Sequence, residues 1–514
     1  MNISDNKRKW LVSIAANLML LIIALDLTIV NLALPTIAHT FNAGMSTLEW
    51  VINAYVVIFA MLLVIGSKLG DIFGHRQIFA IGLSIFTIAS LLGGLSPNTS
   101  MLITSRVLQG VGAALAFPAS TIINFAIFPK EQKAIAMGIT ATIAGAGQAL
   151  GPTIGGIILN FLSWRWVFFV NIPIGAIAIV LLMLTCPRFV LPQVKQKINY
   201  VASILLASSI FFLIFGLIES QHWHIWSIKF AASIILSSVL LLLFYVNNQI
   251  SKQQLFNLKI FFNEKYLIAN IARMVMTFCL FAILFTSVLY MQNIAGINSL
   301  KAGYLLLGMT GVWAGASPLV GLLINRFSSS LKGVLLAGVG CLAISFFFFA
   351  RVTATPQTWI LVVAFVCAGF GIAAMLTSTN IAALTAVHEK QLSNANSLLY
   401  LSASIGNMLG VAVGGSMLSN LSSSYLTKEL LINNIHLTGN RLFSLMQISS
   451  GSYALAKLNV YFDPKMVAKL LPIAEHSFLH AFSAIMWLCI ILLVAVFVIC
   501  ILTLKSDGKG VGCL

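Results

Sequence analysis

Apolar residues recur along the chain in long runs that short polar segments separate. A helix needs about 20 residues to cross the hydrocarbon core of a bilayer, and windows of that length recur nearly from end to end. The strands of a membrane barrel would be about ten residues long with alternating polarity, which the runs lack. The pattern therefore predicts fourteen spanning helices, centred near Ile22, Ala60, Phe86, Gly112, Ala149, Ala176, Ser208, Leu236, Leu280, Val312, Gly340, Gly369, Gly406 and Leu492.

The first apolar run begins like a secretory signal, because basic residues precede it. It extends from Trp10 to about Pro35, however, whereas the apolar part of a signal peptide spans about 7–15 residues. It also contains Asp26 and lacks a convincing small-residue cleavage site. We therefore expect a retained first span.

Composition supports a membrane protein without a large soluble domain. Hydrophobic residues make up 60% of the 514 residues and charged residues only 8%, whereas a soluble domain has roughly 25% charged residues. The net charge of +17 would suggest nucleic-acid binding in a soluble protein, but here the basic residues lie in short loops between apolar runs. The cysteines show no metal-ligand spacing, and nothing indicates a metal, a cofactor or a nucleic-acid partner.

The basic residues predict the orientation. An even number of spans places both termini on one side, and with cytoplasmic termini most Lys and Arg residues fall in inner segments. The short outer loops then hold only Arg165, Lys229, Lys301 and Arg351. We expect a multi-pass protein of the cell (inner) membrane with both termini in the cytoplasm. A long outer loop at about 419–477 has enough apolar residues for one or two amphipathic elements.

Asp26 lies deep in the first predicted span. A carboxylate in hydrocarbon costs several kcal/mol, so such residues usually face a protein interior or a water-filled cavity and carry function. Asn17, Thr28 and Asn31 put polar groups on two sides of the same helix, which indicates protein and water around it rather than lipid. Asp26 is therefore a candidate for proton or cation handling; the alternative is a structural acid paired with a neighbouring arginine.

Arg106 lies within the fourth predicted span and shares a helix face with Gln109 and Gly110. A buried guanidinium needs a partner, and Asp26 is the one acid that is not in a loop or at a span end. The scarcity of acids favours an Asp26–Arg106 pair over snorkelling of Arg106. Arg273 lies nearer to its cytoplasmic end, and there we expect snorkelling.

Two further segments have unusual composition. The segment Ser67–Arg76 joins the second and third spans on the cytoplasmic side, where its glycines permit a tight turn and its charges can form a conformation-dependent latch. A simple connector would not need this set: Ser67, Gly70, Asp71, Gly74 and Arg76. In the fifth span, glycines at every fourth position form a smooth packing stripe beside a helix-bending proline. That set is Gly147, Gly151, Pro152, Gly155 and Gly156.

Together these segments resemble the major facilitator superfamily, and specifically its fourteen-helix drug:proton antiporter branch of the EmrB/QacA type. Ser67–Arg76 resembles the family's cytoplasmic loop motif with Ser67 in place of the first glycine, and Arg106–Gly112 resembles its arginine motif, which is associated with proton coupling. Gly147–Gly156 is similar to the antiporter motif at every fixed position. Leu25–Pro35 and Trp164–Pro173 resemble signatures of the fourteen-helix branch.

The resemblance implies an all-α membrane fold of two six-helix bundles with two inserted central helices. The implied segments are 1–187, 188–265 and 266–514, and the bundles would rock around a midplane site. It also implies a proton-coupled efflux transporter for small lipophilic compounds, in which Asp26 and Arg106 couple the proton. A same-fold exporter of an endogenous metabolite, lipid or siderophore is the alternative, and a non-transporting scaffold or receptor or a membrane enzyme is less consistent with the intact motifs.

The expected partners are the lipid bilayer, protons and a small lipophilic substrate, with a periplasmic adaptor as a further possibility. Because Asp26 alone offers a negative charge at depth, we expect neutral or monovalent cationic substrates rather than divalent ones. The substrate cavity would be apolar with a few polar points: Asn53, Tyr55, Gln109, Tyr290, Asn380, Tyr400 and Asn407.

Overall fold

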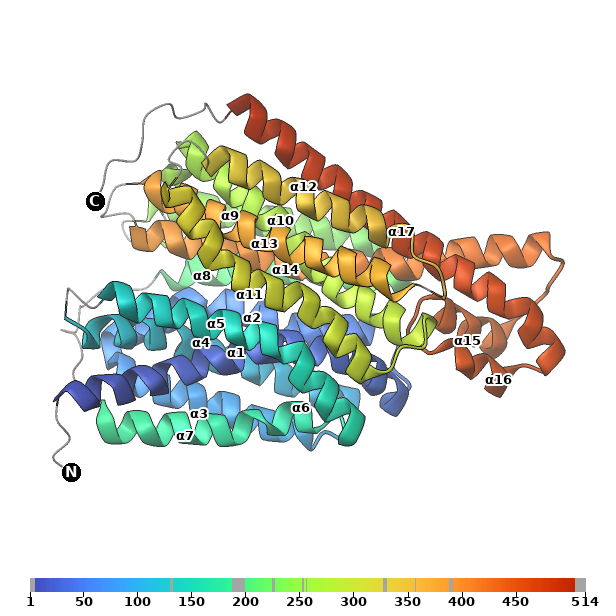
Figure 1. The fold of residues 1–514 in the computed structure, drawn as a ribbon, viewed down its shortest axis with the longest axis horizontal. Helices are drawn as coiled ribbons and strands as arrows, with labels where there is room; N and C mark the ends of the chain where they lie inside the picture. Colours follow the sequence, from blue (N-terminus) through green and yellow to red (C-terminus); the bar gives the residue numbers. More distant parts are fainter. Residues whose placement is uncertain are drawn as a thin grey trace. The chain divides into compact units, whose positions relative to one another are not determined.

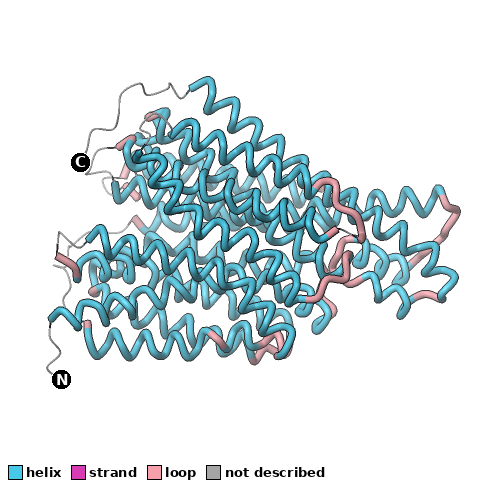
Figure 2. Tube along the Cα trace, in the orientation of Figure 1, coloured by secondary structure: helices cyan, strands magenta, loops and turns pink. Residues whose placement is uncertain are grey.

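The computed structural model of the chain is built from helices and connecting loops (Figures 1 and 2). It describes residues 5–129, 133–186, 199–223, 227–251, 254–255, 257–326, 331–355, 357–387 and 392–503, and no strand occurs among them. The long helices are α1 (Asp5–Phe41), α2 (Met45–Phe73), α3 (His75–Gly94), α4 (Thr99–Ile127), α5 (Lys133–Phe161), α7 (Asn171–Thr185), α8 (Tyr200–Trp223), α9 (Ile228–Ile250), α10 (Glu264–Leu289), α11 (Ser299–Arg326), α12 (Leu331–Phe349), α13 (Thr358–Thr385), α14 (Leu392–Ile432) and α17 (Pro464–Thr503).

Each predicted span centre lies within one of these helices. Within the described residues, 13 helices are long and apolar enough to cross a membrane. The remaining helix at a predicted centre is α5, which has 29 residues and ends in the apolar stretch Leu150–Phe161. The all-α, multi-span fold class is therefore confirmed, and the chain is a multi-pass membrane protein.

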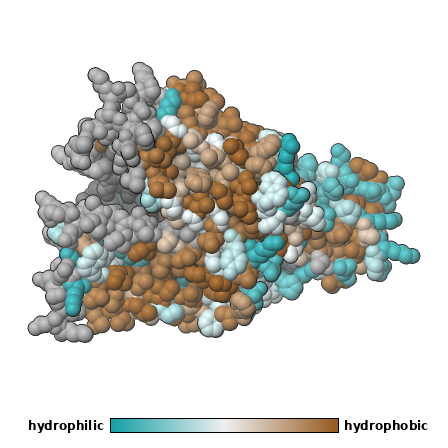
Figure 3. Space-filling view, in the orientation of Figure 1, coloured by the Kyte–Doolittle hydropathy of each residue, from teal (hydrophilic) through white to brown (hydrophobic). Residues whose placement is uncertain are grey.

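The segment predicted as a long outer loop is largely helical. α14 continues to Ile432 and α17 begins at Pro464, so two flanking helices extend into the segment. Between them lie the short helices α15 (Gly439–Ser449) and α16 (Leu458–Tyr461), which follow the expectation of one or two amphipathic elements. In Figure 3, polar side chains gather around this end, whereas apolar side chains cover much of the visible surface along the long helices.

Contacts group the chain into two compact units. Unit 1 consists of Met1–Ala33, Trp50–Gly216 and Trp226–Phe256, and unit 2 of Leu34–Glu49, Leu217–Ile225 and Asn257–Leu514. The division into segments 1–187, 188–265 and 266–514 stays a prediction.

In unit 1, glycines bring α4 against two neighbours. A methyl group added at Gly110 would lie 2.7 Å from the carbonyl oxygen of Tyr55 in α2, and one added at Gly112 would lie 2.6 Å from that of Gly82 in α3. Only a residue without a side chain permits such close backbone approach. The arginine motif thus packs α4 against α2 and α3 directly beside Arg106.

In unit 2, α14 packs against α10 in a similar way. Methyl groups added at Gly406 and Gly410 would overlap the carbonyl oxygens of Met274 and Phe278. This register also brings the hydroxyl of Ser402 within 2.9 Å of the Asn270 side-chain oxygen, to which it donates a hydrogen bond.

Candidate functional site

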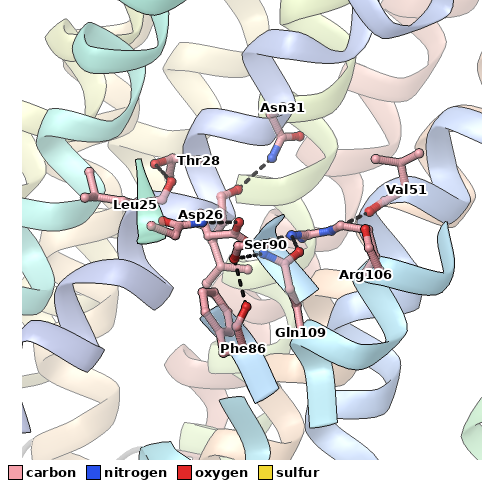
Figure 4. Close-up of polar contacts among 12 residues, drawn as sticks. Leu25, Asp26, Thr28, Asn31, Val51, Phe86, Ser90, Arg106 and Gln109 are labelled. Atoms are coloured by element: carbon pink, nitrogen blue, oxygen red, sulfur yellow. Dashed lines mark hydrogen bonds and ion pairs between the residues drawn. The ribbon is translucent and has the colours of Figure 1, made fainter. Parts of the chain in front are cut away.

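Asp26 of α1 and Arg106 of α4 form a buried ion pair in unit 1 (Figure 4). The distance from Arg106 Nη1 to Asp26 Oδ2 is 2.5 Å, and the two side chains are 1% and 0% exposed. These residues lie 80 positions apart in the chain. The sequence prediction that they pair therefore agrees with the geometry.

Further polar groups fix the orientation of the guanidinium. Arg106 Nε donates to the backbone carbonyl of Val51 at 2.9 Å, and Nη1 also donates to Gln109 Oε1 at 2.8 Å. The ring of Tyr55 lies beside the guanidinium, 4.5 Å from centroid to Cζ, at cation–π distance. Three helices, α1, α2 and α4, thus converge on one charged group.

The network extends to two residues that the sequence did not single out. Gln109 Nε2 donates to Ser90 Oγ at 2.8 Å, and that hydroxyl donates to the carbonyl of Phe86 at 2.9 Å (Figure 4). On the other side, Asn171 Nδ2 is 3.5 Å from Asp26 Oδ1. Asn171 lies within the Trp164–Pro173 signature, so the sequence pointed to its segment. Ser90 lies in an apolar helix without such a motif.

Asn31 and Thr28 of α1 donate their side-chain hydrogen bonds within the helix. Asn31 Nδ2 donates to the Leu27 carbonyl at 2.8 Å, and Thr28 Oγ1 donates to the Leu25 carbonyl at 3.1 Å (Figure 4). Such bonds within a helix satisfy side-chain donors without a partner from elsewhere. Among the polar residues at this depth of α1, Asp26 is the one that forms an ion pair.

The glycine stripe of α5 packs directly against α1. A methyl group at Gly147 would lie 2.8 Å from Ala24 Cβ, one at Gly151 would overlap the Thr28 hydroxyl, and one at Gly155 would lie 2.7 Å from Ile29. Pro152 and Gly156 are buried in the same stretch. The antiporter motif is therefore the surface of α5 against which α1, the helix that contains Asp26, packs.

The cytoplasmic loop motif ends α2 and begins α3. Ser67, Gly70 and Asp71 belong to α2, and Gly74 connects the helices with φ of 94°. Arg76 Nη2 donates to the carbonyl of Met183 near the end of α7 at 2.6 Å, a favourable place for a cation. The Asp71 side chain lies outside the described residues, so the proposed latch stays a prediction.

The residues predicted to line the substrate cavity differ in their hydrogen-bond partners and packing. Gln109 is part of the ion-pair network. The Asn53 side-chain amide and the Tyr55 hydroxyl are buried and have no hydrogen-bond partner among the described residues. Tyr290 donates to the Thr353 carbonyl at 2.6 Å and stacks with Phe482 at 5.3 Å between ring centroids, as a packing residue does.

The other three predicted cavity residues lie in unit 2, on two helices. Asn380 of α13 has its side-chain oxygen 3.4 Å from Arg273 Nη1. Tyr400 and Asn407 are seven residues apart on α14 and so share a helix face. Tyr400 is exposed at 42%, whereas Asn407 is buried.

The surroundings of two further charged residues were not expected from the sequence, and for Arg273 they differ from the prediction. Arg273 does not snorkel to an interface: it is 8% exposed and contacts α13, because the register of α10 directs it toward that helix. Glu49 lies near the start of α2, as expected for an acid at a span end, and it is 0% exposed, with its carboxylate packed against Gly415 of α14 within unit 2. A second acid is therefore buried in the protein.

Comparison with known proteins agrees with this architecture. The profile of the Major Facilitator Superfamily matches residues 16–353 and 271–427. The chain is 29% identical over 416 residues to the tetracenomycin C resistance and export protein of Streptomyces glaucescens, covering 80% of this chain and 76% of that protein. It is 30% identical over 426 residues to the multidrug resistance protein Stp of Mycobacterium tuberculosis (strain CDC 1551 / Oshkosh), covering 83% and 79%.

A crystal structure of a bacterial homologue of the human lysosomal transporter Spinster has the same fold, with a TM-score of 0.65 at 15% identity over 98% of this chain and 99% of that one. The family profile, the drug-resistance relatives and the apolar helices all point to transport rather than to enzymatic catalysis. The chain belongs to the major facilitator superfamily and is a multi-pass membrane transporter similar to drug-resistance and export proteins.

Proposed function

We propose that the protein exports small lipophilic molecules from the cytoplasm in exchange for protons. The observation that carries the proposal is the Asp26–Arg106 pair, a carboxylate and a guanidinium buried together where helices from one unit converge. The relatives of this protein that are named for tetracenomycin C export and for multidrug resistance support outward transport and a lipophilic substrate.

In this mechanism Asp26 exists in two forms that differ in their hold on Arg106. The ionised carboxylate binds the guanidinium through a charge-assisted hydrogen bond, which is roughly twice as strong as a neutral one. A proton that arrives from outside neutralises Asp26 and weakens this contact between α1 and α4. Release of the proton to the cytoplasm restores the pair, so each protonation state favours a different arrangement of the helices.

The driving force is the proton gradient. Each proton that moves inward gains about 2.3 kcal/mol per 100 mV of membrane potential, and a pH gradient adds to this. We place the protein in the cell membrane with both termini in the cytoplasm, as the distribution of basic residues predicts. In unit 1, the Asn53 amide and the Tyr55 hydroxyl, which have no partner among the described residues, would offer polar contacts to a bound substrate.

Everted membrane vesicles from cells that overproduce the protein test this function. With an acidic lumen, dyes or quaternary ammonium compounds should accumulate in vesicles with the wild-type chain, and a protonophore should abolish the accumulation. Vesicles without the protein are the control. Gradient-dependent accumulation of an endogenous metabolite, but of no drug or dye, would favour the same-fold alternative, and no gradient-dependent transport at all would contradict the proposal.

A further inference from the structure

Arg273 is a buried cation in unit 2 that the proton-coupling scheme does not use. It lies on α10, nine residues after Glu264, where the helix begins, so it is roughly 14 Å along the helix from that end. Its side chain is 8% exposed. A charge in such a place needs compensation from neighbouring groups.

The compensation that the protein supplies is weak. Arg273 Nη1 donates to Asn380 Oδ1 at 3.4 Å and to the Leu376 carbonyl at 3.5 Å, both long for hydrogen bonds, and Nε has no hydrogen-bond partner among the described residues. Among the residues that the structure describes, no carboxylate lies within 4.0 Å of the Arg273 guanidinium, whereas Asp26 lies beside Arg106. Neutral oxygens thus hold the group in place and leave its charge unmatched.

The surroundings offer further hydrogen-bond donors. Tyr400 lies on the part of α14 that packs against α10, where Ser402 donates to Asn270 and Gly406 approaches the Met274 carbonyl. It also interacts electrostatically with Arg273. Ser404 and Asn407 follow Tyr400 at intervals of four and three residues and so share its face of α14. Hydroxyl and amide groups of this kind donate to oxygen acceptors.

We infer that Arg273, together with Asn380 and Tyr400, binds an oxyanion carried by a lipophilic substrate, such as a carboxylate or sulfonate on an aromatic body. The guanidinium supplies a planar fork that matches two oxyanion oxygens, and ligand binding provides the negative charge that the protein lacks there. The inference rests on the proposed export function, because it takes the ligand to be transported cargo. It adds cargo with an anionic group to the neutral and monovalent cationic cargo expected from the sequence.

Two fluorescent probes share one ring skeleton and differ in the anion: 8-anilinonaphthalene-1-sulfonate and the uncharged N-phenyl-1-naphthylamine. Binding of each to the purified full-length chain in phosphatidylcholine nanodiscs is measured by quenching of tryptophan fluorescence, with empty nanodiscs as the blank. Arg273→Gln should weaken binding of the sulfonate about tenfold or more, the loss expected for one charge-assisted contact, and change binding of the amine less than twofold.

Arg351→Gln is the matched control, because it removes the same charge from an exposed position in unit 2 that stacks on Phe347. It should bind both probes as the wild type does. Arg273→Lys should give an intermediate loss for the sulfonate, because it keeps the charge without the fork. Arg273→Lys also serves as the test variant if Arg273→Gln does not fold.

The inference is overturned if Arg273→Gln binds both probes equally weakly, if it binds the sulfonate as the wild type does, or if a selective loss appears only when phosphatidylglycerol is present, which would assign the site to a lipid headgroup. Binding needs no proton gradient. Selective sulfonate binding without proton-driven transport would therefore contradict the export proposal alone, and transport without that selectivity would contradict this inference alone.

Discussion

A buried ion pair is stabilising only when its geometry and its hydrogen bonds offset the loss of solvation. At Asp26–Arg106 this requirement is met by a 2.5 Å contact, the Val51 carbonyl and the Gln109 side chain. The guanidinium is therefore held whether or not Asp26 carries its charge. That arrangement suits a site where the carboxylate changes protonation while the arginine remains in place.

Two substitutions of Arg106 should distinguish the effect of its positive charge from the effect of its planar guanidinium geometry. Arg106→Ala should stop gradient-driven export and destabilise the protein by about 3–5 kcal/mol, because Asp26 is left as an uncompensated buried charge. Arg106→Lys should retain part of the activity, since one ammonium group cannot reach Asp26, Val51 and Gln109 with the geometry of the fork. Thermal unfolding and vesicle efflux measure the two effects.

The exposed Arg351→Gln variant is the control for loss of a positive charge. Normal export by a well-expressed Arg106→Ala variant would show that coupling between α1 and α4 does not depend on this pair.

For single residues, the sequence predicts which charged residues form an ion pair better than it predicts which side chains are buried. Asp26 and Arg106 were paired correctly because so few acids lie inside apolar runs. Snorkelling of Arg273 was predicted from its distance to a helix end, whereas α13 covers its side chain. The burial of Glu49 near the start of α2 depends on its contact with α14, which the sequence does not show. The contacts of Val51 and Ser90 could not be predicted from the sequence. Every residue has a backbone carbonyl, and a single serine is common in any helix.

The helices themselves are set by length and composition, and the sequence therefore predicts them well. Every predicted centre lies in a helix. Boundaries in the outer segment were less predictable, because α14 and α17 extend past the apolar runs as polar helices. The glycine stripe was recognised as a packing surface, but its partner, α1, became clear only from the structure.

The contact between α5 and α1 can be tested at Gly151. A methyl group there overlaps the Thr28 hydroxyl, so Gly151→Ala should destabilise the protein by about 1–3 kcal/mol, the usual cost of overpacking. Thr28→Ala in the same chain should relieve much of the loss, because residues in contact are energetically coupled. Thermal unfolding in detergent measures both.

Gly315→Ala is the matched control, since a methyl group at Gly315 in α11 meets nothing within 4 Å. Equal stability of the Gly151 and Gly315 variants would contradict close packing of α5 on α1.

The turn between α2 and α3 gives a separate test of backbone conformation. Gly74 has φ of 94°, and an added methyl group would touch nothing within 4 Å, so Gly74→Ala changes backbone strain alone. We expect a loss of about 1–3 kcal/mol in unfolding experiments. Gly333→Ala, also in open space but without a positive φ, should cause no loss. Equal stabilities would contradict the conformation of this turn.

For the whole molecule, the distribution of basic residues predicts the orientation. In a chain without native cysteines, Asn440→Cys in α15 should react with a membrane-impermeant maleimide in intact cells. Lys7→Cys at the start of α1 should react only after the membrane is opened. Both positions are exposed, so accessibility depends on the side of the membrane. The reverse pattern would contradict cytoplasmic termini.

The resemblance to the drug:proton antiporter branch already implied the fold, and the family is confirmed. The nature of the cargo could not be predicted in the same way. The sequence suggested neutral or monovalent cationic compounds because only Asp26 was expected at depth, whereas Glu49 and Arg273 are buried as well. Burial of these side chains depends on contacts between distant helices, which no single run of sequence encodes.

Proton movement that depends on Asp26 is the central claim, and proteoliposomes with a pH-sensitive dye in their lumen test it most directly. A compound that the vesicle assay identifies as cargo is added to wild-type and Asp26→Asn protein, both first shown to bind it equally. The account predicts a cargo-dependent change in lumenal pH for the wild type, abolished by Asp26→Asn. Proton movement in the Asp26→Asn variant equal to that of the wild type would contradict the account.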